Sequence, residues 1–278
     1  MSLVRTAQPV LSHGRRPGAT AVPRARLMPV LLPWLVPALG IAAWQAAADC
    51  GWLPARFLPS PLSVVRAAVR LGASGELARH VAVSTRRAAI GFAIGGGIGL
   101  ALGFLNGLSE TADRLFDSTL QMARSVPHLA LIPLVILWLG IGETAKVALV
   151  ALGVVFPLYL NTVHGLRSLD PRLIELGRVH GLSRAAMIRR IILPGALPSI
   201  LVGVRYGLGL MWLSLIVAET ISAESGIGYL AMNAREFLQA DVVLLSIVLY
   251  ALLGKLADAI TRWLERWLLP WHPKLGTR

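Results

Sequence analysis

The arginines of this sequence concentrate in one segment that lies between two apolar stretches. These positions are Arg167, Arg172, Arg178, Arg184, Arg189 and Arg190. Charged side chains are costly to place in lipid, so this segment must lie in water although both of its flanks are apolar. The charge of this loop, which lies between two predicted membrane helices, indicates a surface on which a partner docks.

The common catalytic patterns do not occur in the sequence. There is no H-E-x-x-H, no G-x-S-x-G and no aspartate dyad, and the run 225–228 has no nearby histidine. His128 and His180 have no second ligand at a suitable spacing, and the single cysteine, Cys50, excludes an internal disulfide. The sequence also lacks G-x-x-x-x-G-K-[ST], the phosphate-binding loop of many ATPases. We therefore expect no catalytic residue, no metal site and no cofactor on this chain.

The composition is typical of a membrane protein. The chain is 55% hydrophobic and 15% charged, with a mean hydropathy of +0.67. An average soluble domain has roughly 45–50% apolar and about 25% charged residues. The net charge of +13 could suggest nucleic acid, but the basic residues lie beside apolar spans and do not alternate with aromatic residues. We expect an integral membrane protein without a nucleic-acid partner.

The apolar stretches predict an all-α protein with about six transmembrane helices, each near the roughly 20 residues that a bilayer requires. The predicted spans are Leu27–Ala48, Ala88–Gly107, Leu120–Leu139, Ala145–Val163, Ala196–Ala218 and Val242–Leu264. Lys and Arg are more numerous on the side that holds both termini and the charged loop. The positive-inside rule therefore predicts that both termini are cytosolic.

The spans divide the chain into four predicted regions. Residues 1–26 form a basic cytosolic arm, whose composition cannot bury a core. Residues 27–81 hold the first transmembrane helix and an external amphipathic segment. Residues 82–266 form the core transmembrane domain, which contains the cytosolic loop 167–194, and residues 267–278 form a cytosolic tail.

In the external segment, apolar residues and arginines each recur at the spacing of a helix. Leu62, Val65 and Val69 recur at helical spacing, and Arg66 and Arg70 lie one turn apart. This pattern predicts an amphipathic helix on the membrane surface.

The second span contains a ridge of glycines, with one at every fourth position: Gly91, Gly95, Gly99, Gly103 and Gly107. Successive G-x-x-x-G steps leave one helix face without side chains, so another backbone can approach closely. The ridge indicates either helix packing inside one subunit or a sliding surface between moving parts.

The charged loop has the local signals of a helix, a turn and a second helix. Asp170 and Pro171 favour the N-cap and the first position of a helix. Gly181 permits a sharp turn, because glycine adopts positive φ at little cost. Ser183 can cap a second short helix over 184–192, after which two prolines begin the next span.

Ionisable residues within the spans are candidates for a transport route. Arg205 lies deep in the fifth span, where it could line the path of an anion or pair with a neighbouring carboxylate. Glu219, near the outer end of the same helix, is expected close to water or a partner. We expect Arg124 to extend toward the membrane surface, and Lys255 and Asp258 to neutralise each other.

The loop also resembles a known motif. Glu175 is followed by Gly181, Ile191, Leu193 and Pro194 at the spacing of the E-A-A…G…I-x-L-P loop in permeases of type I ABC importers. The resemblance extends over roughly residues 34–267, with runs such as "LPGALPSILVGVRYGLGLMW" and "LIVAETISAESGIGYLAMNAREFLQADVV". It is strongest to permeases for aliphatic sulfonates, in a subgroup that includes taurine, nitrate and bicarbonate permeases.

This resemblance implies a type I ABC importer permease fold in the bacterial inner membrane. It implies two cytosolic ATP-binding subunits, which hold the ATP and Mg, together with a second copy of the permease and a periplasmic substrate-binding protein. The loop residues implied to contact the ATP-binding subunit are Glu175, Gly177, His180, Gly181, Leu182, Ile191, Leu193 and Pro194. Leu176 and Gly177 stand where the family usually has alanines, and Gly177 should loosen the helix by about 1 kcal/mol.

The resemblance implies import of aliphatic sulfonates by alternating access, with taurine, nitrate or bicarbonate as alternative substrates. An ion-coupled secondary transporter or a channel would fit the composition equally well. Such a transporter would show internal repeats with interrupted helices at matching places. The sequence shows no such repeats.

Overall fold

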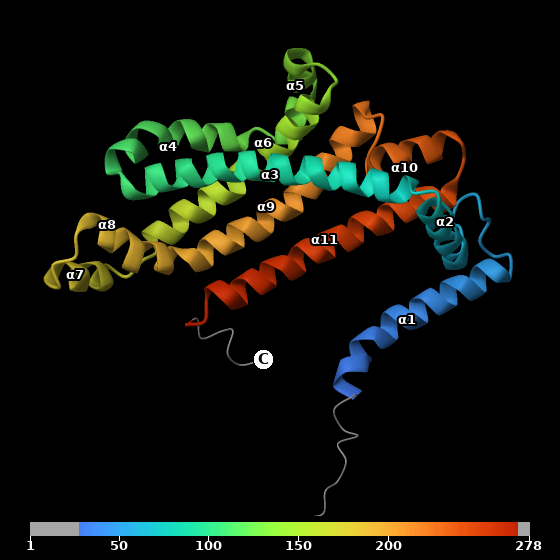
Figure 1. Cartoon of the computed structure of the whole chain (residues 1–278), viewed down its shortest axis with the longest axis horizontal. Coiled ribbons are helices and arrows are strands. Elements are labelled where there is room, and N and C mark those ends of the chain that lie inside the picture. Colours follow the sequence, from blue (N-terminus) through green and yellow to red (C-terminus); the bar gives the residue numbers. More distant parts are fainter. Residues whose placement is uncertain (1–27, 272–278) are drawn as a thin grey trace, which may run out of the picture.

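The computed structural model describes residues 28–271, and within that range every regular element is helical (Figure 1). The first half contains α1 (Met28–Asp49), α2 (Pro61–Ala73), α3 (Glu76–Leu108), α4 (Glu110–Ser125), the 3₁₀ turn η2 (His128–Leu131) and α5 (Ile132–Leu139). The second half contains α6 (Glu143–Arg167), α7 (Pro171–Val179), α8 (Arg184–Met187), the π-helical turn η3 (Ile188–Ile192), α9 (Leu193–Ser222), α10 (Ile227–Glu236) and α11 (Ala240–Leu268). The basic arm 1–26 and most of the predicted tail lie outside the described residues.

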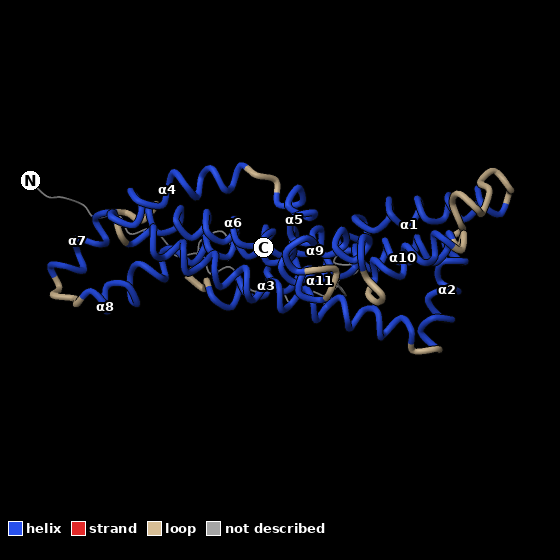
Figure 2. Tube along the Cα trace, turned by 90° about the horizontal axis from the view of Figure 1, so that it is seen from above, coloured by secondary structure: helices blue, strands red, loops and turns tan. Residues whose placement is uncertain are grey.

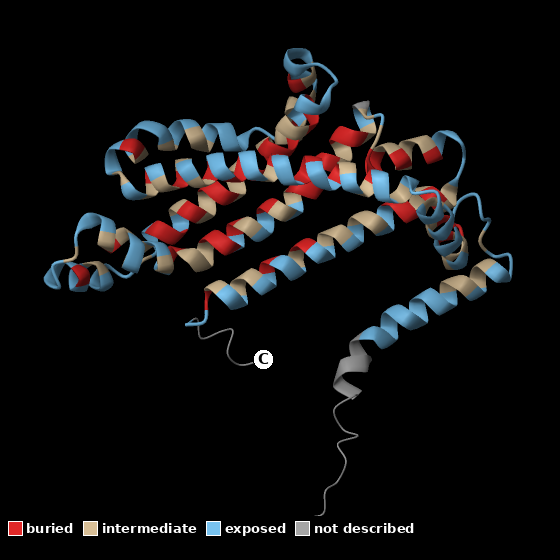
Figure 3. Cartoon of the chain, in the orientation of Figure 1, coloured by how far each residue is buried: buried red, intermediate tan, exposed pale blue. Residues whose placement is uncertain are grey.

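The core forms around α6, which packs against α3 on one side and α9 on the other. Val150, Val154 and Leu158 of α6 are almost fully buried and meet Leu215 of α9. Figure 3 shows this buried strip along α3, α6 and α9, whereas α1, α4 and much of α11 are exposed. Exposed apolar helices are expected of a chain that faces lipid or further subunits.

The glycine ridge of α3 packs against α6 of the same chain. A Cβ atom on Gly91 would lie 2.5 Å from Val150 Cγ1, and one on Gly103 would lie 2.5 Å from Thr162 Cβ. At Gly95 and Gly99 the nearest atoms are backbone carbonyl oxygens of α6. The missing side chains therefore let the two helices approach until their backbones touch.

Four described helices are long and apolar enough to cross a membrane, namely those over 76–108, 143–167, 184–221 and 240–268. The predicted single span Leu120–Leu139 is wrong, because the chain bends by 81° between α4 and α5. Pro127 has no N–H to donate and disfavours helical geometry at Val126, which is extended at φ −77° and ψ 120°. The pair α4 and α5 forms a fifth span only as a broken one.

The first predicted span forms α1, which diverges from the other helices (Figure 1). Its side chains Trp34, Leu35 and Val36 are exposed. Leu62 N donates to Gln45 Oε1 at 3.0 Å, which ties the end of α1 to the start of α2. A helix that is apolar on all sides and has few protein neighbours is suited to lipid or to another subunit.

The external amphipathic segment forms α2. Val64 and Ala67 on one face are buried against α10 and α11. Leu62, Val65 and Val69, the apolar residues noted in the sequence, are exposed on another face. The helix thus packs on protein with one side and presents a second apolar stripe outward.

The predicted second short helix of the loop begins at Arg184 as expected but does not end before the next span. From Arg184 the chain continues through η3 into α9, so that 184–221 is one helical run. Pro194 lies in the first turn of α9. Proline is tolerated in such a setting because the wider π-helical turn rearranges the hydrogen bonds that its missing N–H would make.

Candidate functional site

The charged loop folds as a helix, a tight turn and a second helix. Asp170 Oδ1 accepts a hydrogen bond from Arg172 N at 2.9 Å at the start of α7. Gly181 has φ +69°, in the left-handed region that favours glycine. Ser183 Oγ accepts from Ala186 N at 3.3 Å and begins α8. These local contacts bring the two helices together at one end of the molecule, as Figure 2 shows for α7 and α8.

Gly177 is the contact point between the two loop helices. It is buried, and a Cβ there would lie 2.7 Å from Met187 Cε and from Ile191 Cδ1. The departure from alanine at this position therefore allows α7 to lie close to the second helix. The gain in packing compensates for the lower helix propensity of glycine.

The outward side of α7 combines charge with exposed apolar side chains. Leu173, Leu176 and Val179 are exposed at a spacing of three residues, and Glu175 is exposed beside them. Of the other loop residues singled out in the sequence, His180, Gly181 and Leu193 are exposed, and Leu182, Ile191 and Pro194 are partly buried. An exposed apolar stripe rimmed by charges is typical of a protein-binding surface.

A polar network lies at the opposite ends of α3, α6 and α9, and sequence reasoning missed it. Arg87 Nη1 donates to Glu219 Oε1 at 2.8 Å, and Arg87 Nε donates to Glu143 Oε2 at 2.7 Å. The Arg87 side chain is 2% exposed and that of Glu219 is 0% exposed. Ser84 and Tyr250 also donate to the Glu219 carboxylate. Of the two surroundings expected for Glu219, water or a partner, water is wrong, because these donors satisfy its charge inside the protein.

The network also fixes the start of α10. Three successive backbone N–H groups donate to it, in the pairs Gly226 to His80 Nδ1, Ile227 to Ser84 Oγ and Gly228 to Glu219 Oε2. A carboxylate at a helix N-terminus is favoured by the helix dipole and by the free N–H groups. The loop before α10 is therefore anchored to α3 and α9 through buried hydrogen bonds.

Arg205 pairs with carboxylates of α11. Arg205 Nη2 donates to Glu265 Oε2 at 2.8 Å, and Arg205 Nε lies 3.6 Å from Asp258 Oδ1. Asp258 also pairs with Arg262, so the expected pair of Asp258 with Lys255 is wrong. Of the two possibilities for Arg205, pairing with a neighbouring carboxylate is the one that occurs.

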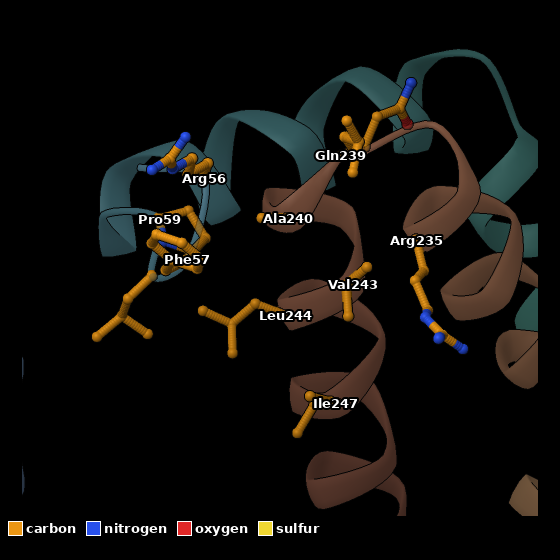
Figure 4. A pocket seen from close by; sticks show the side chains of 11 residues that line it. Arg56, Phe57, Pro59, Arg235, Gln239, Ala240, Val243, Leu244 and Ile247 are labelled. Atoms are coloured by element: carbon orange, nitrogen blue, oxygen red, sulfur yellow. The ribbon is translucent and has the colours of Figure 1, made fainter. Parts of the chain in front are cut away.

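Two of the cavities beside the helices combine basic and apolar side chains in their walls. One of about 300 Å³ opens between the α1–α2 connection and the start of α11. Its two arginines, Arg56 and Arg235, point away from each other (Figure 4). The other, of about 380 Å³, lies between the α4–α5 bend, α6 and α9. Among the described residues, His, Cys, Asp and Glu form no group that could hold a metal ion.

The fold is that of a permease subunit of an ABC transporter. One chain in the crystal structure of an amino acid ABC transporter with histidines matches with a TM-score of 0.55 at 18% identity, covering 72% of this chain and 97% of that one. At this identity the likeness concerns the fold alone.

The chain belongs to the family of binding-protein-dependent transport system inner membrane components, whose family model matches residues 93–270. A putative aliphatic sulfonates transport permease protein of Escherichia coli K12 is 60% identical over 91% of this chain and 96% of that protein. A Bacillus subtilis protein of the same description is 46% identical over 86% of each chain. The taurine transport system permease protein of E. coli is 36% identical over 84% of this chain and 86% of that protein. This chain is a multi-pass membrane permease.

Proposed function

We propose that this permease imports aliphatic sulfonates. The observation that carries the proposal is the 60% identity to the E. coli protein described as a putative aliphatic sulfonates permease, over almost the whole of both chains. The identity to the taurine permease is 36%, which favours the sulfonate class in general over taurine in particular.

The proposed transporter contains two copies of this chain, two cytosolic ATP-binding subunits that hold ATP and Mg, and a periplasmic substrate-binding protein. Both termini and the loop 167–194 face the cytosol. Nucleotide closes the ATP-binding subunits, the loop follows them, and the helices alternate between an inward-open and an outward-open state. The exposed apolar stripe and basic rim of α7 support this role for the loop.

Uptake by cells that lack their own sulfonate permease tests the substrate class. Cells expressing the full transporter should accumulate labelled ethanesulfonate, and unlabelled nitrate or bicarbonate should not compete. The ATP-binding subunit should copurify with this chain. Protein that purifies alone and imports sulfonate down an ion gradient would instead be a secondary transporter, and the proposal would be wrong.

Charge reversal in the loop should uncouple transport from ATP hydrolysis. Glu175 is exposed on α7, and Glu175→Lys adds positive charge to a surface already rich in arginine. We expect the protein to insert normally into the membrane. Sulfonate uptake should fall about tenfold or more, which corresponds to a loss of ~1.4 kcal/mol in binding free energy between the loop and the ATP-binding subunit. Gly181→Asp should act similarly, because φ +69° strains any side chain there.

Glu110→Lys is the matched control for this prediction. Glu110 is also exposed, at the start of α4, where Arg114 is its one ion-pair partner among residues 28–271. The control should retain uptake, since an exposed pair contributes about 0–1 kcal/mol. Wild-type uptake by both Glu175→Lys and Gly181→Asp would contradict a coupling role for the loop.

A further inference from the structure

The 380 Å³ cavity lies halfway along the spanning helices. Pro157 on its wall is 14 residues from the start of α6, or about 21 Å along the helix. Tyr206 on the opposite wall lies near the middle of α9. The loop between α4 and α5, drawn in tan in Figure 2, closes a third side. Irregular backbone at membrane depth is tolerated where it lines a cavity, so the broken span fits a route through the protein.

Three basic or polar side chains line this cavity. Arg124 lines it from the last turn of α4 and makes no ion pair with any described carboxylate. His128 lies next to it, with Nε2 2.9 Å from Ser214 Oγ, which holds the ring in place. Asn161 Nδ2 donates to Pro157 O at 2.9 Å, so the amide is also fixed. The cavity wall thus carries one arginine without an ion pair among the described residues, together with two polar side chains held by hydrogen bonds.

The rest of the wall is apolar. Leu152, Phe156 and Leu160 of α6 line it together with Leu210 of α9. A pocket whose wall combines a cation from α4 with aliphatic and aromatic side chains from α6 and α9 complements a small anion that carries an apolar chain. A volume of about 380 Å³ is within the range of small-molecule sites.

We propose that this cavity is the subsite through which the substrate passes, with Arg124 binding the anionic head group and the α6 wall receiving its aliphatic chain. The proposal rests on the proposed function, since it assigns residues to a sulfonate route. It replaces Arg205 and Glu219 as the route residues, because each is already paired with an opposite charge, Arg205 with Glu265 on α11 and Glu219 with the buried Arg87. In the other cavity Arg56 and Arg235 diverge, so they cannot bind one head group together (Figure 4).

The test uses the complete transporter in lipid vesicles, with labelled ethanesulfonate and octanesulfonate as probes. Arg124→Gln should lower uptake of both at least about tenfold at low substrate, because a charge-assisted hydrogen bond is lost. Arg124→Lys keeps the charge and should restore most of the uptake. ATP hydrolysis stimulated by the binding protein should stay near the wild-type rate, since the loop is unaltered.

A second variant probes the apolar wall independently. Leu160→Trp fills the cavity and should reduce octanesulfonate uptake several-fold more than ethanesulfonate uptake. Arg114→Gln is the matched control, because Arg114 is on the same helix as Arg124 but pairs with Glu110 and does not line the cavity; this variant should transport normally. Equal amounts of purified complex for each variant confirm assembly.

The outcomes separate the two proposals. The subsite is wrong if the wild-type transporter imports both sulfonates and the Arg124→Gln and Leu160→Trp variants import them at the same rates and with the same chain-length preference. The proposed function would still stand in that case. A wild-type complex that imports neither sulfonate overturns the proposed function and the subsite with it.

Discussion

Gly95→Ala should break the helical core, whereas Gly97→Ala, two residues further along the same helix, should leave it intact. A Cβ on Gly95 would meet the carbonyl oxygen of Ala151 and lie 2.8 Å from its Cα. These are backbone atoms of α6, so no side chain can rotate away and the two helices must separate. Overpacking a core lowers the free energy of unfolding by about 1–3 kcal/mol. We expect a loss at the upper end of this range, because the clash is with backbone atoms of α6.

Gly97 is a close control because it is exposed and a Cβ there has nothing within 4 Å. Alanine at Gly97 should even stabilise α3, since it is favoured over glycine by about 1 kcal/mol in a helix. Size-exclusion profiles of detergent-solubilised protein after heating measure both variants. Equal melting temperatures for the two would show that α3 and α6 do not pack as closely as described.

Arg87→Met should destabilise the protein by about 3–5 kcal/mol, because it leaves the Glu219 carboxylate buried without its cation. The same change removes the hydrogen bond from Arg87 Nη1 to the carbonyl oxygen of Ser225, which holds the loop before α10. The expected result is a large fall in melting temperature, together with faster proteolysis of the segment around residue 226. Arg70→Met removes an exposed pair with Asp241 and should cost only about 0–1 kcal/mol.

A double variant tests whether the charge itself is responsible. Glu219→Gln in the Arg87→Met background removes the uncompensated charge but keeps an oxygen that can accept from Gly228 N. We expect this double variant to recover more than half of the lost stability. If it is no more stable than Arg87→Met alone, the loss comes from packing around the arginine side chain rather than from the buried charge.

Features that depend on neighbouring residues could be predicted from the sequence. The caps at Asp170 and Ser183, and the turn at Gly181, follow from short-range rules and form as expected. The glycine ridge predicted a close helix contact, although periodicity alone could not tell that α6 is the partner. The resemblance to ABC permeases supplied the class, which the comparisons with known proteins confirm.

Features that depend on distant pairing could not be predicted. Arg87 and Glu219 are 132 positions apart, and neither belongs to a local pattern that indicates the other. The 81° break between α4 and α5 was hidden because most of the stretch 120–139 is apolar, so hydropathy outweighed the signal of Pro127. Arg124 was expected at the membrane surface for the same reason, since only the break brings it to the cavity.

The helical run over 184–221 has a mechanical consequence. Its 38 residues make a lever about 57 Å long that starts in the charged loop and ends beside Glu219. A tilt of about 5° at one end sweeps the other through about 5 Å for a rod of that length. The π-helical turn lies near the loop end, so most of the arm beyond it is free of that interruption. A small tilt of this helical run at the loop end would thus displace its other end, at the far side of the membrane, by several ångströms.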